Sequence, residues 1–587
     1  MTSIQKFNYL LTPSQKKQLI VLAFLLLIGM LFEMAGLGVL LPALGLMLKA
    51  DVVKDYPFLK PIINYIGNPS QKQLLIYGMS LLIVVYVIKT IYLIFLGWKQ
   101  SKFTSQLSAD LSEKLFLGYM RQPYTFHLQR NSAELLRNIQ AEVGQFTAVS
   151  QAAVTLSSEL SVISGVAFLL ILAEPIGAIS VTLFLGITAF VFHRLTRNKL
   201  LKWGVSRQFH AGNTNQHLLQ GLGGVKDIIL MGREENFLKQ FAVHNRAYAR
   251  IQLKTMTLSL APRFYLELFA VLGLVGLILA MVLQNKPLEL LIPTIGIFVA
   301  AAFRMIPSLN RIMSSMQTVR YTQSTVEVLY KELVTINESR KNELKNNNIL
   351  DFREKLCGKN LTFSYNDAKS KAIENISITI IKGQSVGLIG ASGSGKSTLV
   401  DLILGLLEPD QGEFLVDSKS MKDNLRNWQN KIGYVPQAIY LIDDSLRKNI
   451  AFGIPDEQID DLAIMRALKA AQMDEFVNTL PEKLETFVGE RGVRLSGGQR
   501  QRIGIARALY HDPEVLVLDE ATSALDSDTE SDVMLAVNAL QGEKTIIIVA
   551  HRLSTVENCN YIYRLENGKI INEGNSKDIL DSIKKVR

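Results

Sequence analysis

Six apolar stretches in the first 315 residues constrain the fold of this chain more than any other feature. Each is long enough to cross a lipid bilayer, which takes about 20 residues in a helix that rises roughly 1.5 Å per residue. Only Glu174 and Pro175 separate the third stretch from the fourth, so these two should form a tight hairpin. We expect an all-helical membrane domain over residues 1–334. Its six helices are predicted at about residues 19–48, 74–98, 150–173, 175–195, 257–284 and 289–315.

Positive charge is concentrated in the segments that connect these stretches. The chain has 63 Lys and Arg against 53 Asp and Glu, a formal net charge of +10. Lys and Arg favour the cytoplasmic loops of membrane proteins, and the polar segments 99–149 and 196–256 are rich in both. This explains the net charge without a nucleic-acid partner, and it predicts that both termini are cytoplasmic. The first stretch lacks the cleavage pattern of a signal peptide and should be retained.

The pattern changes after the sixth stretch. Residues 335–350 are polar, with little capacity to bury surface, and are expected to be a linker. Over residues 351–587, strands rich in β-branched residues alternate with helical stretches, which is typical of an α/β domain. The predicted fold is therefore a six-helix membrane domain fused to an α/β domain.

A glycine-rich segment lies between a strand predicted over residues 385–389 and a helix predicted over 399–407. This is the context of a phosphate-binding loop, whose backbone N–H groups surround phosphate oxygens at a positive helix N-terminus. Lys396 should reach the β- and γ-phosphates of ATP, and Ser397 should ligate Mg²⁺. The nucleotide-binding residues predicted here are Gly390, Ser392, Gly393, Gly395, Lys396, Ser397 and Thr398.

Two carboxylates end a buried strand predicted over residues 515–518. Asp519 is placed to hold Mg²⁺ through water, and Glu520 to polarise the water that attacks the γ-phosphate. In isolation, a helix cap would explain this pair equally well. Beside a phosphate-binding loop, it indicates ATP hydrolysis.

A second glycine-containing helix start makes the assignment more specific. Residues 495–499 read Leu-Ser-Gly-Gly-Gln, and the whole segment 351–587 resembles the ABC ATPases. In that family this signature binds the γ-phosphate of ATP held by the phosphate loop of another subunit, so the resemblance implies a dimer. No motif is degenerate, which favours a homodimer. The residues concerned are Ser496, Gly497, Gly498 and Gln499.

The resemblance also implies roles for single residues elsewhere in this domain. Tyr365 matches the aromatic residue that stacks on adenine, and Gln437 matches the glutamine that contacts Mg²⁺. Asp526 ends a segment that crosses the dimer interface. His551 matches the histidine that senses the γ-phosphate, and it is assigned to catalysis together with Glu520.

Six helices followed by one ABC ATPase resemble a half-transporter of the exporter type. Residues 123–138 and about 217–232 resemble the coupling segments that dock on the ATPases in such exporters, with ordinary amphipathic helices as the alternative. The resemblance implies an ATP-hydrolysing translocase in the bacterial inner membrane, with ATP and Mg²⁺ as cofactors. A regulator or gated channel is a further alternative, against which the intact Glu520 argues.

Charged residues inside the apolar stretches bear on what is moved, because such residues are costly in lipid and usually face a cavity or a partner. Arg304 and Arg311 are seven residues apart and share one helix face. Several cations in a cavity suit an anionic, phosphate-bearing cargo. Arg263 could instead pair with Glu267 four residues on, and Arg311 could be a cytoplasmic flank. The predicted substrate residues are Lys89, Arg263, Arg304 and Arg311.

A closer resemblance is to the lipid-linked oligosaccharide flippases of bacterial protein N-glycosylation. It rests on residues 261–267, residues 303–311 and the first stretch around Phe32–Glu33. It implies a polyprenyl-pyrophosphate oligosaccharide that moves from the cytoplasmic to the outer leaflet, and a short external helix over residues 52–66. Lys89 departs from the arginine expected there and lacks its bidentate fork. A phospholipid, a lipid A type lipid, a drug or a peptide is the alternative cargo.

Overall fold

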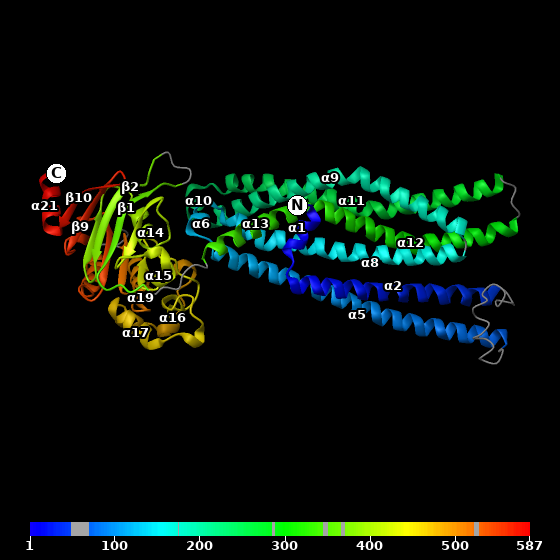
Figure 1. The fold of residues 1–587 in the computed structure, drawn as a ribbon, viewed down its shortest axis with the longest axis horizontal. Coiled ribbons are helices and arrows are strands. Elements are labelled where there is room, and N and C mark those ends of the chain that lie inside the picture. Colours follow the sequence, from blue (N-terminus) through cyan, green and yellow to red (C-terminus); the bar gives the residue numbers. More distant parts are fainter. Residues whose placement is uncertain are drawn as a thin grey trace. The chain divides into compact units, whose positions relative to one another are not determined.

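The computed structural model describes residues 1–48, 70–173, 175–283, 288–343, 350–365, 370–521 and 527–586. It divides into two compact units. The first comprises Met1–Gln122 and Gln129–Lys341, and the second comprises Pro123–Leu128 and Asn342–Arg587. The first is a bundle of long helices and the second contains the β-sheets (Figure 1). The external helix predicted over residues 52–66 lies outside the described residues.

Each of the six predicted spans lies in one long helix of the first unit. These helices are α2 (Pro13–Leu48), α5 (Gln71–Met120), α8 (Val143–Ala173), α9 (Pro175–Gly223), α11 (Glu234–Leu283) and α12 (Leu288–Tyr321). Within the described residues, four segments are long and apolar enough to cross a membrane: Pro13–Gly36, Lys72–Met120, Ser132–Phe168 and Glu234–Gly276. The first unit also contains α1 (Ser3–Leu10), α7 (Ser132–Arg137), α10 (Val225–Met231) and the π-helix η2 (Asn138–Glu142). Two further helices, α6 (Tyr124–Gln129) and α13 (Gln323–Glu343), cross the sequence boundaries between the units.

Several long helices extend far beyond their apolar stretches. The helix predicted to end at residue 98 continues to Met120 as α5, and the one predicted to start at residue 257 begins at Glu234 as α11. The extensions stay helical because neighbouring helices cover one face of each: Leu107, Leu111 and Leu115 of α5 are buried. Hydropathy therefore locates the membrane-spanning part of a helix and not its ends.

A buried polar layer joins η2, α9 and α13 in the first unit. The carboxylate of Glu142, in η2, accepts hydrogen bonds from Arg207 of α9 at 3.2 Å and from Thr325 of α13 at 2.6 Å. The side chains of Glu142 and Arg207 are 0% and 4% exposed. A π-helix leaves backbone carbonyls out of the regular ladder, and the carbonyl of Ile139 accepts from Ser112 of α5. Side chains from three elements therefore converge on this one turn.

Helix α13 runs through the first half of the segment predicted as a linker. It continues to Glu343, and Ile336 is buried against the bundle. Ile336 packs against Gly118 of α5, so this part of the polar segment has an apolar contact with the bundle. Residues 344–349 lie outside the described residues.

The second unit has two sheets. An antiparallel sheet has the order β2-β1-β4-β5, and a six-stranded sheet has the order β10-β9-β3-β8-β7-β6, parallel except where β10 joins β9. The strands are β1 (Lys355–Phe363), β2 (Ile373–Ile381), β3 (Ser385–Ile389), β4 (Gln411–Val416), β5 (Lys419–Ser420), β6 (Ile432–Val435), β7 (Val515–Asp519), β8 (Thr545–Ala550), β9 (Tyr561–Glu566) and β10 (Lys569–Asn575).

The central strands of the parallel sheet read as continuous apolar runs because both of their faces are covered: helices pack on one face, and α14 (Lys396–Ile403) and the antiparallel sheet pack on the other. Every residue of β3 and β8 is buried. The other main helices of this unit are α17 (Asp461–Ala470), α19 (Gly497–Leu509), α20 (Ser527–Asn538) and α21 (Ser576–Val586). The predicted fold class, a helical membrane domain fused to an α/β domain, is confirmed.

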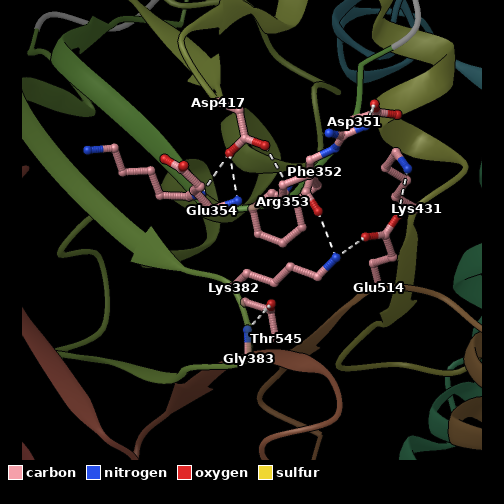
Figure 2. Close-up of polar contacts among 11 residues, drawn as sticks. Asp351, Phe352, Arg353, Glu354, Lys382, Gly383, Asp417, Lys431, Glu514 and Thr545 are labelled. Carbon is pink, nitrogen blue, oxygen red and sulfur yellow. Dashed lines mark hydrogen bonds and ion pairs between the residues drawn. The ribbon is translucent and has the colours of Figure 1, made fainter.

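The segment that enters the second unit is fixed by charged side chains (Figure 2). The carboxylate of Asp417 accepts from the backbone N–H groups of Arg353, Glu354 and Lys355, at 2.5, 3.0 and 2.8 Å. The ammonium group of Lys382 donates to the carbonyl of Phe352 and to Glu514, both at 2.7 Å. Because Glu514 directly precedes β7, these contacts attach the entering segment to both sheets.

Candidate functional site

The predicted phosphate loop lies between β3 and α14, where the parallel strands of the sheet end. Gly395 has φ +101, and a Cβ there would lie 2.7 Å from the carbonyl oxygen of Ala372. Only glycine fits such a position. The helix begins at Lys396, three residues before the predicted start, so the loop leads directly into a helix N-terminus. Ser397 is exposed there, and Thr398 is buried.

Lys396 lies folded back over its own loop. Its ammonium group donates to the carbonyl oxygens of Gly390 and Ala391, both at 3.0 Å. Burial lowers the pKa of Lys396, although the nearby carboxylates of Glu520 and Asp519 oppose that shift. The loop thus holds a desolvated cation close to two carboxylates.

Strand order brings the other predicted catalytic residues to the same edge. Because β8 lies between β3 and β7, Glu520 after β7 and His551 after β8 follow neighbouring strands. The Nε2 atom of His551 lies 2.6 Å from one carboxylate oxygen of Glu520. The side-chain amide of Gln437 donates to the other oxygen at 2.8 Å. Three residues predicted separately from the sequence are therefore in direct contact.

The oxygen atoms of this site fit a magnesium-bound nucleotide. Asp519 Oδ1 and Ser394 Oγ are buried and have no hydrogen-bond partner among the described residues. Burial, and then the charge of Glu520, raise the pKa of Asp519. Burial, and then Asp519, raise the pKa of Asp401 to about 6. Carboxylate and hydroxyl oxygens are the ligands that Mg²⁺ prefers, and a divalent cation would relieve this crowding of acidic groups.

Tyr365 lies beside the phosphate loop. Its hydroxyl group is 3.2 Å from Thr398 Oγ1, and its ring packs edge-on against Phe363. The side chain is partly exposed, as an adenine-stacking residue must be. Asp526, predicted for the dimer interface, lies outside the described residues.

The predicted signature forms the start of α19. Ser496 caps the helix: its Oγ accepts from the N–H of Gln499 at 3.2 Å, and its own N–H donates to the Gln499 side chain at 2.8 Å. Gly497 and Gly498 form the first turn. Within the described part of the chain, these side chains bond each other and not the phosphate loop of the same chain. The signature is thus a second helix N-terminus able to bind an anion.

Three of the four predicted substrate cations are paired with glutamates. Lys89 lies 2.8 Å from Glu33, Arg263 lies 2.9 Å from Glu267, and Arg311 lies 2.5 Å from Glu159. The side chain of Arg304 lies outside the described residues. Pairing of Arg263 with Glu267 is the structural alternative that the sequence left open, and the structure shows it.

Glu159 was not singled out from the sequence. It lies inside the span predicted over residues 150–173. The criterion that selected Arg311, a charged residue within an apolar stretch, would also have found Glu159. Its pairing with Arg311 could not be foreseen, because the two residues are on different helices, α8 and α12.

The sequence matches two protein families. Residues 19–305 match the "ABC transporter transmembrane region" family, and residues 373–523 match the "ABC transporter" family. Similar proteins include an "ATP-dependent lipid A-core flippase" of Nitrosococcus oceani, 31% identical over 80% of this chain and 78% of that protein. Another of the same name, from Shewanella denitrificans, is 31% identical over 82% of this chain and 80% of that protein.

A solved structure has the same fold. It is described as "Structure of a bacterial Atm1-family ABC exporter with ATP bound", and it matches with a TM-score of 0.79. The match covers 96% of this chain and 97% of the other, at 21% sequence identity.

Proposed function

Because this chain belongs to the ABC transporter family, as an exporter half-transporter that hydrolyses ATP, we propose that it moves a phosphate-bearing lipid across the bacterial inner membrane. The observation that carries ATP-driven transport is the convergence of Lys396, Glu520 and His551 at one sheet edge, in a chain whose other unit is a bundle of membrane-length helices. We further propose the boundaries 1–334 and 351–587 for the two domains, and cytoplasmic positions for both termini.

The residues at the sheet edge divide the work of ATP hydrolysis. The backbone N–H groups of the phosphate loop and Lys396 would hold the phosphates, and Glu520 would orient the attacking water. Ser397, Asp519 and Gln437 would hold Mg²⁺, which neutralises charge on the phosphates. In the described state Gln437 contacts one oxygen of Glu520 and His551 contacts the other, and each oxygen keeps a lone pair with which to accept a hydrogen bond from water.

We propose that the active species is a dimer of two identical chains. Ser496 and Gln499 cap their own helix and leave its N-terminus open to an anion, as a site shared with the phosphate loop of a second chain requires. Apolar side chains along the predicted coupling segment, Leu222, Ile229, Leu230 and Met231, are largely exposed in the single chain. A second copy would cover them.

The proposed cargo is a lipid whose head group carries phosphate. The relatives reported above are named for lipid A-core, so a lipid A type lipid is the first candidate. The polyprenyl-pyrophosphate oligosaccharide inferred from local resemblance has no support among those relatives and stands as the second candidate. Both carry phosphate on a long apolar anchor and could bind exposed arginines such as Arg263 and Arg311.

ATPase activity in lipid nanodiscs tests the proposed cargo. Bisphosphorylated lipid A should stimulate the purified protein, and lipid A stripped of both phosphates should not. Stimulation by a polyprenyl-pyrophosphate oligosaccharide alone would favour the second candidate. If neither phosphorylated lipid alters the ATPase rate, and a neutral drug or a peptide does, the proposal of a phosphate-bearing cargo is wrong.

A further inference from the structure

The pair formed by Arg311 and Glu159 differs from the other two in where its charges lie. Two bonds join the groups: Arg311 Nε donates to Glu159 Oε1 at 2.5 Å, and Nη2 donates to Oε2 at 3.1 Å. The carboxylate is 11% exposed and the guanidinium side chain 47% exposed. A nearly buried anion thus holds one edge of a cation that is open on its other side.

The pairs formed by the other two predicted substrate cations, Lys89 and Arg263, lack this asymmetry. Lys89 and Glu33 are 13% and 12% exposed, so the ammonium group is covered along with its partner. Arg263 and Glu267 are on one helix, and their side chains are 68% and 50% exposed. Among the predicted substrate cations whose side chains are described, only Arg311 presents a half-exposed guanidinium to a nearly buried carboxylate.

The packing of α12 explains the position of the guanidinium. Met305, Ser308, Leu309, Ile312 and Met313 are buried against neighbouring helices. Arg311 projects from the opposite side, where Phe303 and Pro307 are also exposed. Glu159, from α8, reaches the near edge of the guanidinium and leaves its outer edge uncovered.

We propose that Glu159 is the resident counter-ion of Arg311 and sets the affinity for the phosphate of the cargo lipid. This inference rests on the proposed function and deepens it. Carboxylate and phosphate are both bidentate acceptors for guanidinium. Without cargo, Glu159 spares Arg311 the cost of an unpaired charge in an apolar environment. With cargo, the two anions compete for one cation, and Glu159 favours release by taking Arg311 back.

Competition between Glu159 and the cargo phosphate predicts in which direction the affinity for cargo changes when Glu159 is neutralised. Glu159→Gln removes the competing charge with little change in shape. The concentration of bisphosphorylated lipid A that gives half-maximal ATPase stimulation should fall roughly tenfold, because Glu159 no longer repels the phosphate. The maximal stimulated rate should fall as well, since release is slower. A merely structural ion pair predicts neither change.

A double-mutant cycle identifies Arg311 as the group through which Glu159 acts. Arg311→Gln should raise the half-maximal concentration, and adding Glu159→Gln to that variant should cause no further shift. Glu235→Gln is the matched control. It removes the same charge from an exposed pair with Lys239 and should leave the cargo response unchanged.

Glu159→Asp retracts the charge by one methylene and should shift the half-maximal concentration less than Glu159→Gln, in the same direction. This variant keeps the test usable if Glu159→Gln does not fold.

The outcomes separate this inference from the function on which it rests. An unchanged or raised half-maximal concentration in Glu159→Gln overturns the counter-ion role, even while the wild type responds to lipid A. A shift that persists in the Arg311→Gln background overturns it too. A wild-type protein that responds to neither lipid A nor polyprenyl pyrophosphate overturns the proposed cargo, and the counter-ion role with it.

Discussion

Glu520 is held in a position that an ordinary residue avoids. Its φ angle is +50, in the left-handed region, and its N–H donates to the carbonyl of Val549 on the neighbouring strand. Such a conformation costs about 1 kcal/mol or more and persists only where the surroundings impose it. Here it turns the carboxylate toward Gln437 and His551 and away from solvent.

His551 should act on hydrolysis and not on ATP binding. In His551→Ala the Glu520 carboxylate loses the partner that orients it, so kcat for ATP should fall about 100-fold or more. KM for ATP should change less than about threefold, because the phosphate loop is untouched. His511→Ala removes an exposed histidine outside the site and serves as the control. A kcat within twofold of the wild type would refute the assigned role.

The sequence predicted the ATP site better than the membrane site, for a physical reason. Lys396, Glu520 and His551 each follow a short apolar strand within a contiguous motif, and in the phosphate loop the backbone conformation also requires glycine at position 395. The partner of Arg311 is chosen only when two helices pack. A sequence shows that Glu159 and Arg311 are both costly in lipid, and it does not show that they meet.

Among the elements, the π-helix η2 is bonded to three others, α5, α9 and α13. It directs Glu142 into a layer formed by α9 and α13 and makes a buried ion pair with Arg207. No sequence pattern predicted this turn, because its cause is tertiary. The six long helices, in contrast, follow from apolar length, and the polar segments 99–149 and 196–256 that extend several of them have a helical pattern in the sequence.

Breaking the buried pair should destabilise the bundle strongly. Glu142→Gln leaves Arg207 without its counter-charge in a site closed to water, a change that typically costs about 3–5 kcal/mol. The midpoint of thermal unfolding of the detergent-solubilised protein should fall clearly. Glu235→Gln, in an exposed pair, should leave the midpoint almost unchanged. Equal midpoints for the two variants would show that the buried polar layer contributes little to the stability of the bundle.

At the scale of the whole molecule, a shared ATP site predicts complementation between two inactive chains. Neither Lys396→Ala nor Ser496→Arg should hydrolyse ATP as a pure homodimer. In a mixed dimer, one site combines both defects and the other site is intact. Mixed dimers purified through two different tags should therefore regain vanadate-dependent nucleotide trapping. A mixed dimer that traps no more nucleotide than either parent would argue against the shared site.

Active transport by this protein requires that ATP hydrolysis be coupled to lipid movement. The most direct measurement is transfer of a fluorescent bisphosphorylated lipid A between the leaflets of proteoliposomes, with the wild type and Glu520→Gln compared at equal protein content. We predict ATP-dependent transfer by the wild type and, in Glu520→Gln, no transfer above that of protein-free vesicles. Transfer by Glu520→Gln at the wild-type rate would contradict the account.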